Sequence, residues 1–306
     1  MTNEQAVQEF VDKRPTDVKD LAVCLSLSFG RFQITKKVRV EKVEVDADKE
    51  MIGVHKKILD SNAYKAITSL DSTISNYVKA RALPSLLRRG IYLLPVAMVQ
   101  DIEGAIEEFR IQRDTLIEEF LADYDREILS ARERLASLYN EQDYPSAEEV
   151  RGRFILTYRI FSAEVPEALA DLSSLVYERE KERAKKFWED SKLVIEEKLT
   201  EEFSGLVNHL VERLHTEPGE KPKIFKDTLL GNFDDWVELF ESRNLTKNEA
   251  LNEQVQKARA VLRTVSPNDL RKNAPLRQEI QQSFAAIKQA TDQFIITKPS
   301  RLLDLD

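Results

Sequence analysis

The sequence is poor in the residues that make turns. Its 306 residues include only 8 Gly and 10 Pro, together about 6%, which is roughly half of average usage. A chain with so few turn residues favours long helices and argues against a sandwich, barrel or propeller over its whole length. Cysteine is scarcer still, because Cys24 stands alone. A single cysteine excludes an internal disulfide and fits a reducing cytoplasm.

Long apolar runs are missing as well. No stretch reaches the ~18 consecutive apolar residues of a membrane-spanning helix. The first 17 residues mix acidic and apolar side chains, which is unlike a signal peptide. Charged residues make up 33% of the chain and apolar residues 42%, so it resembles neither a disordered chain nor a membrane protein. We therefore expect a cytoplasmic protein with a sizeable core and about two domains.

Neither a basic excess nor a catalytic motif is present. The net charge of −8 argues against a dedicated nucleic-acid coat, for which a basic domain is expected. The three histidines, His55, His209 and His215, lack the spacing of a chelating pair. The eight glycines stand singly, so no glycine-rich loop can cradle a phosphate. These features predict a non-enzymatic protein without a metal or cofactor.

Two segments alternate with the period of a β-strand. Leu21, Val23, Leu25, Leu27 and Phe29 alternate with small residues over 21–29, which is typical of a half-buried strand. Gly30-Arg31 suggests a tight hairpin after it, with a third strand near 38–45. Residues 153–165 nearly alternate too, and we expect this strand to pair with 21–29.

The rest of the chain has helical spacing. Apolar residues recur every three or four positions over 96–140, apart from a gap of seven in which Arg113 sits, and again over 166–215. The middle of the second stretch, 178–186, is almost wholly charged and is expected to reach into solvent as part of a coiled coil. Consecutive elements tend to be neighbours, so we expect the two helices to pair as an antiparallel hairpin.

The predicted fold is mainly α, with a small antiparallel β element, a long coiled-coil-like helical hairpin and further C-terminal helices. A segment rich in Pro and Gly at 216–222 marks the best linker. The expected organisation is therefore a polar N-terminal segment (1–20), a β-hairpin and helical-hairpin domain (21–215), that linker, and a C-terminal helical region (223–306).

Two groups of residues are candidate binding surfaces. The first is a cluster of aromatic and arginine residues, which are frequent in interface hot spots; the alternative is that its aromatics are core and its arginines bridge to helix carboxylates. The second is a basic patch that could meet phosphates or an acidic partner. The candidate partner interface is Tyr144, Pro145, Arg151, Phe154, Tyr158 and Arg159, and the candidate basic patch is Lys36, Lys37, Arg39, Arg88 and Arg89.

The order of several segments resembles a bacterial and phage domain family of unknown function. These segments are LAVCLSLSFGRFQIT, ALPSLLRRGIYLLP, a long acidic helix ending in EEFLADYD, and YPSAEEVRGRFILTYRIFSAEVP. The resemblance covers roughly residues 20–215. Genes of that family often lie beside MoxR-type AAA ATPases and proteins with a von Willebrand factor A domain. The resemblance implies a role as an adaptor or substrate in such a module, and it carries over no catalytic residue.

Three functions remain open at this point. The first is a non-enzymatic interaction or adaptor protein, with a MoxR-type AAA ATPase as the implied partner. The second is a phage or bacterial structural protein that self-associates through its helices. The third is a nucleic-acid-associated factor that uses the basic residues.

Overall fold

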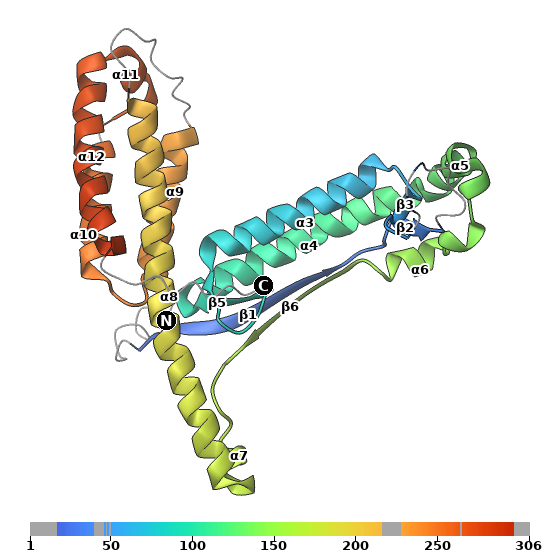
Figure 1. Cartoon of the computed structure of the whole chain (residues 1–306), viewed down its shortest axis with the longest axis horizontal. Helices are drawn as coiled ribbons and strands as arrows, with labels where there is room; N and C mark the ends of the chain where they lie inside the picture. The colour runs from blue at the N-terminus through green and yellow to red at the C-terminus, as the bar shows by residue number, and fades with distance from the viewer. Residues whose placement is uncertain are drawn as a thin grey trace. The chain divides into compact units, whose positions relative to one another are not determined.

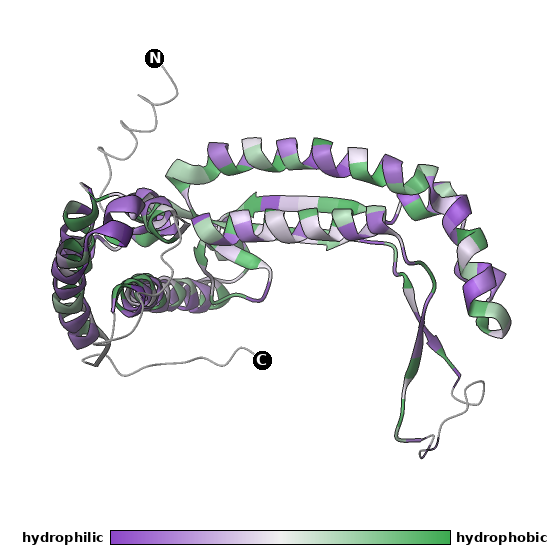
Figure 2. Ribbon diagram, turned by 90° about the horizontal axis from the view of Figure 1, so that it is seen from above, coloured by the Kyte–Doolittle hydropathy of each residue, from purple (hydrophilic) through white to green (hydrophobic). Residues whose placement is uncertain are grey.

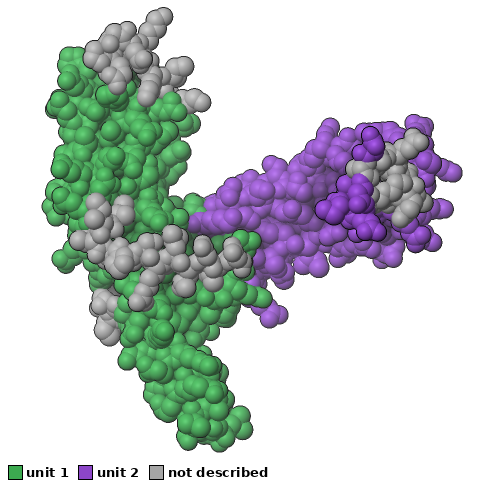
Figure 3. Space-filling model, viewed as in Figure 1, with its two compact units in different colours: residues 1–25, 80–99, 160–306 green, residues 26–79, 100–159 purple. Residues whose placement is uncertain are grey.

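The computed structural model describes residues 17–39, 46, 48, 50–215, 228–263 and 265–296. The chain divides into two compact units (Figure 3). Unit 1 comprises residues 1–25, 80–99 and 160–306, and unit 2 comprises residues 26–79 and 100–159. The predicted linker at 216–222, most of the predicted N-terminal segment and the residues 40–45 of the predicted third strand lie outside the described residues.

A four-stranded sheet has the order β4-β5-β1-β6. Its members are β1 (Ala22–Gly30), β4 (Leu83–Pro84), β5 (Ile91–Pro95) and β6 (Ile155–Phe161). Gly30 lies against Ile155, and Ser28 hydrogen-bonds Thr157 at 3.2 Å, so β1 and β6 run antiparallel. The predicted pairing of the segments 21–29 and 153–165 is therefore confirmed.

The predicted hairpin at Gly30-Arg31 is corrected by the sheet topology. The next strand, β2 (Thr35–Val38), pairs antiparallel with β3 (Val54–Lys57) in a separate two-stranded sheet. The bond from Ile58 N to Ile34 O, 2.7 Å long, extends this ribbon. Residues 31–34 have no regular structure because, as described below, Arg31 and Phe32 are held by contacts to helices.

Unit 2 is built around two helices that pack side by side, α3 (Asn62–Arg81) and α4 (Val99–Ala122) (Figure 1). The Tyr77 and Phe109 rings meet edge to face with centroids 5.6 Å apart, and Tyr64 meets Phe120 in the same way at 5.7 Å. Burial of such aromatic side chains supplies a large share of core stability. Shorter elements complete the unit: α5 (Tyr124–Leu135), η3 (Ala136–Leu138), η4 (Glu141–Asp143) and α6 (Ala147–Arg151).

Unit 1 is a helical bundle around the second half of α8 (Ser174–Leu214). Ile195, Phe203 and Leu210 of α8 are buried in one apolar core with Phe233 and Phe284. The helices that complete the unit are α2 (Val18–Leu21), η2 (Val96–Met98), α7 (Ala168–Leu172), α9 (Thr228–Arg243), α10 (Glu249–Leu262), α11 (Pro267–Lys272) and α12 (Ala274–Ile296). The C-terminal helices thus share their core with α8.

The mainly α fold with a small antiparallel sheet is confirmed, but the two long helices differ from the prediction. The first ends at Ala122, with α5 beginning at Tyr124, and the second is interrupted at Ser173. Each also packs mainly within its own unit: α4 lies on α3, and α8 lies on α12. The hairpin prediction paired them because they are neighbours in sequence, whereas the apolar faces of α3 and α12 provide closer partners.

Candidate protein-interaction surface

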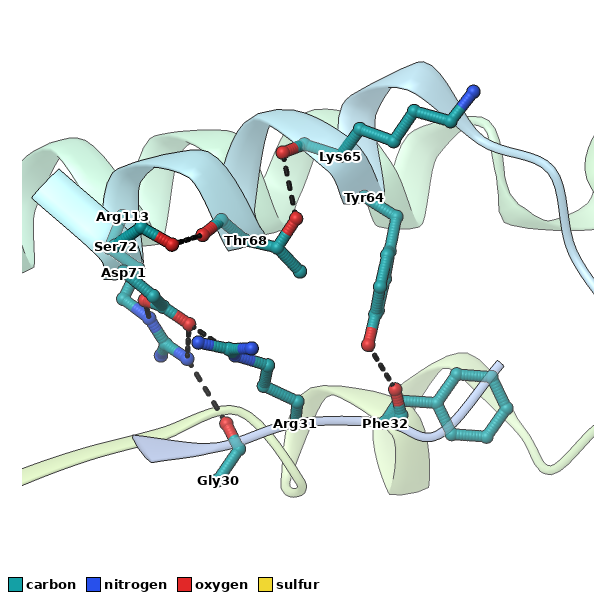
Figure 4. A network of polar contacts seen from close by, with 9 residues as sticks. All are labelled: Gly30, Arg31, Phe32, Tyr64, Lys65, Thr68, Asp71, Ser72 and Arg113. Carbon is teal, nitrogen blue, oxygen red and sulfur yellow. Dashed lines mark hydrogen bonds and ion pairs between the residues drawn. The ribbon is translucent and has the colours of Figure 1, made fainter. Parts of the chain in front are cut away.

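A buried carboxylate joins three segments of unit 2 (Figure 4). Asp71 of α3 is fully buried and accepts hydrogen bonds from Arg113 of α4 and from Arg31, which follows β1. The distances are 2.7 Å from Arg113 Nε to Asp71 Oδ1 and 2.6 Å from Arg31 Nε to Asp71 Oδ2. Arg113 Nη2 also donates to the Gly30 carbonyl oxygen at 3.0 Å. Both oxygens of Asp71 therefore accept hydrogen bonds, and this carboxylate connects α3 to α4 and to the end of β1.

The aromatic members of the predicted partner interface point largely into the core of unit 2. Phe154 is half-buried and lies 5.8 Å from the Phe120 ring, centroid to centroid. Tyr144 is also half-buried, and its hydroxyl donates to the Ile58 carbonyl oxygen at 3.0 Å. Burial raises the pKa of Tyr144 to about 12. The carbonyl oxygen of Pro145 accepts a hydrogen bond from Tyr124 at 3.1 Å.

The other members of that interface lie nearer the surface. Arg151 is exposed and pairs with Glu118 of α4. Tyr158 is half-buried, and its hydroxyl donates to Glu107 Oε1 at 3.3 Å. Arg159 is exposed on β6. The structure thus matches the alternative in which aromatics fill the core and an arginine bridges to a helix carboxylate.

The basic residues fall into separate units. Lys36 and Lys37 lie on β2, opposite Lys56 and His55 of β3, and belong to unit 2 together with the exposed Arg39. Arg88 and Arg89 are exposed in the turn between β4 and β5 of unit 1.

Acidic partners neutralise part of the positive charge on β3. Lys56 Nζ lies 2.5 Å from Asp143 Oδ2, and Lys57 Nζ lies 2.5 Å from Asp60 Oδ1. The ribbon therefore presents less charge to a phosphate backbone than its lysine count suggests.

Exposed leucines lie at the end of α7 and in the first turn of α8. Every buried residue of α8 lies at Trp188 or beyond, so residues 174–187 contribute no fully buried side chain to the core. Leu172 at the end of α7 is 84% exposed and Leu175 is 82% exposed. Leu172 lies in the stretch 166–215, where apolar residues recur at helical spacing, but the structure leaves its side chain at the surface. The expected exposure of the charged segment 178–186 is confirmed.

The second half of α8 is anchored to α9 by a partly buried carboxylate. Glu202 accepts hydrogen bonds from Trp236 Nε1 at 2.9 Å and from Arg243 Nη2 at 3.1 Å. Burial opposes ionisation of Glu202, but the hydrogen bonds and charge of Arg243 outweigh it and lower the pKa of Glu202. The second half of α8 is thus fixed against α9, and it supports the exposed first half of the same helix.

Within the described part of the chain, no three His, Cys, Asp or Glu side chains are grouped so that they could hold a metal ion. Hydrophobic and hydrophilic residues are interspersed along the helices (Figure 2). Over these same residues, none of the helices has the length and apolarity needed to cross a bilayer. Comparison of the chain with protein-family models, curated proteins and solved structures finds no match.

Proposed function

We propose that this chain is a non-enzymatic interaction protein, an adaptor that holds another protein through α7 and the exposed face of α8. The observation that carries the proposal is the exposure of Leu172 and Leu175, at 84% and 82%. Large apolar side chains gathered at the surface are typical of sites that bind another protein. Leu175 lies on α8, whose second half is built into the core of unit 1 and gives this leucine a rigid support, and Leu172 ends the neighbouring helix α7.

The class of partner comes from the family resemblance of residues 20–215. That resemblance makes a MoxR-type AAA ATPase the proposed partner, together with a protein that contains a von Willebrand factor A domain. Exposed leucines suit such a partner, because large apolar side chains at the surface are typical of sites that bind another protein. The aromatic cluster around Tyr144 and Phe154 then supports the fold of unit 2, and Arg151 and Arg159 are its surface-exposed members.

Co-purification from the native host tests the proposal. The tagged full chain is isolated with a non-hydrolysable ATP analogue present, and bound proteins are identified by mass spectrometry. We expect a AAA ATPase with the wild-type chain and its loss with the double variant Leu172→Ser, Leu175→Ser. The matched control is Leu129→Ser, which changes a leucine that is 63% exposed on α5. Absence of any AAA ATPase from the wild-type sample, or equal capture by the double variant, would overturn the proposal.

A further inference from the structure

One face of α8 carries a seven-residue repeat that is exposed along its whole length. An α-helix has 3.6 residues per turn, so Leu175 and Leu193, 18 residues apart, lie on the same side. Leu193 is 52% exposed, while Trp188, Ser191 and Ile195 on the opposite side are buried. Between the two leucines the same face continues at spacings of four and three. Its six exposed members are Leu175, Arg179, Glu182, Lys186, Glu189 and Leu193.

We propose that a second copy of this chain packs antiparallel on this face, with Leu175 of each copy against Leu193 of the other. A two-fold axis at the level of Ala184 produces this arrangement, because Ala184 lies midway between the two leucines. The same axis places Arg179 opposite Glu189 and Glu182 opposite Lys186. The repeat of four and three residues is that of a coiled coil, in which such positions meet in layers. Each of its layers is thus apolar or oppositely charged.

Charge complementarity selects a second copy in this orientation. A parallel pair in register would place each of Arg179, Glu182, Lys186 and Glu189 against itself, and like charges at close range are unfavourable. The segment 175–193 contains six basic and five acidic residues, whereas the whole chain has a net charge of −8. Two copies of this segment therefore approach without the repulsion that the rest of the surface would produce.

The residues beside the central layers also bear on the pairing. In the antiparallel register, Glu178 of one copy lies near Lys192 of the other, and Arg179 lies near Asp190. Two contacts at the axis are unfavourable: Lys185 lies near Lys185 of the second copy, and Arg183 lies near Arg183 of the second copy. The Arg183 guanidinium is already paired with Glu180 at 2.7 Å within its own chain, and this pairing reduces the repulsion. Because charged layers outnumber apolar ones, we expect a specific dimer of modest affinity.

The inference rests on the proposed function only in treating the exposed face of α8 as an interaction surface. Because both interfaces use Leu175, the second copy and the ATPase compete for this face. The test measures the mass of the full chain by light scattering coupled to size exclusion, over about 1–100 μM, which spans the range of modest affinities. We expect the wild-type chain to change with concentration from 35.3 kDa to twice that mass. A wild-type chain that stays at 35.3 kDa throughout would overturn the proposal.

Charge-reversed variants test the register. Position 182 of one copy meets position 186 of the other in two symmetric layers. In a dimer of the Glu182→Lys variant, both sides of each of these layers are lysine. In a dimer of the Lys186→Glu variant, both sides are glutamate. Each variant alone should raise the dimer dissociation constant by about 10- to 100-fold, as expected for buried like charges. An equimolar mixture of the two variants should restore a dimer. In that mixed dimer, both layers join a lysine of the first variant to a glutamate of the second.

The control variant is Lys181→Glu, which changes an exposed lysine on another side of the same helix and should leave the dimer intact. Circular dichroism checks that each variant keeps its helix content. Dimers that survive both single variants, or single variants whose mixture stays monomeric, would show that the register is wrong. A wild-type dimer without a captured ATPase would overturn the proposed function alone, and a captured ATPase with a monomeric chain would overturn this inference alone.

Discussion

Arg113 and Asp71 form a buried ion pair between α4 and α3, with Nε 2.7 Å from Oδ1 and side-chain exposures of 2% and 0%. Breaking a buried pair by removing one partner leaves an uncompensated charge in the core. The carboxylate also holds Arg31, so that one side chain connects two helices to the end of β1. The stability of unit 2 therefore depends on Asp71 more than on any surface ion pair.

Replacing Asp71 by Asn should destabilise the chain by about 3–5 kcal/mol, the usual cost of breaking a buried ion pair. The measurement is the free energy of unfolding from urea denaturation. The control is Glu107→Gln, which removes an exposed pair with Arg110 and should cost less than about 1 kcal/mol. Equal losses of unfolding free energy in the two variants would contradict the stabilising role of Asp71.

Replacing Tyr64 by Phe should cost about 1–3 kcal/mol, because it leaves a buried carbonyl without a donor. The Tyr64 hydroxyl donates to the Phe32 carbonyl oxygen at 2.6 Å, in a buried position (Figure 4). Thermal unfolding monitored by circular dichroism measures the loss. Tyr158→Phe is the matched control, since its hydroxyl bond to Glu107 is exposed and 3.3 Å long. A smaller loss at Tyr64 than at Tyr158 would argue against this role.

Gly30 and Gly104 should respond to alanine in opposite directions. A Cβ at Gly30 would lie 2.9 Å from the Arg153 carbonyl oxygen and 3.0 Å from Ile155 Cβ, so Gly30→Ala should destabilise the chain by about 1–3 kcal/mol. Gly104 lies in α4 with nothing within 4 Å of its Cβ position, and Gly104→Ala should stabilise the chain by about 0.5–1 kcal/mol. Urea midpoints measure both changes, and a stabilising Gly30→Ala would contradict the close approach of β1 and β6.

Glu202 should make stability depend on pH in the acid range. Its pKa in the folded chain lies below the ordinary value of 4.5, so the folded state favours the ionised form. That contribution is fully present above the unfolded pKa and is lost as the pH falls below 4.5 and through the folded pKa. Unfolding free energies between about pH 7 and pH 3 should therefore fall less steeply in Glu202→Gln than in the wild-type chain. The matched control is Glu201→Gln, at the neighbouring exposed position.

Local patterns in the sequence predicted several elements well. Alternation over 21–29 and 153–165 predicted β1, β6 and their pairing. Ser146 and Glu149 also have the spacing of a capping box in the sequence, and the structure shows that capping box at the start of α6. These predictions succeeded because strand alternation and helix capping depend on residues close together in the chain.

Contacts between distant segments were harder to predict. Arg113 interrupts the apolar spacing of α4 because it occupies a core position, and its partner Asp71 occupies a core position of α3 between Ile67 and Ile74. The gap at Arg113 was visible in the sequence, but nothing in that helix identifies Asp71 of the other helix as its partner. The expected pairing of the two long helices has the same cause, because it rested on their proximity in sequence. In the structure, α4 packs on the apolar face of α3 and α8 packs on that of α12.

The pairing of Ser28 with Thr157 joins residues 129 positions apart. During synthesis at about 5–20 residues per second, roughly 6–26 seconds separate the emergence of these two residues from the ribosome. Over that interval the β6 side of β1 is an open strand edge, and open edges invite pairing with other chains. Slow completion of this sheet makes the nascent chain a candidate client for chaperones that shield strand edges.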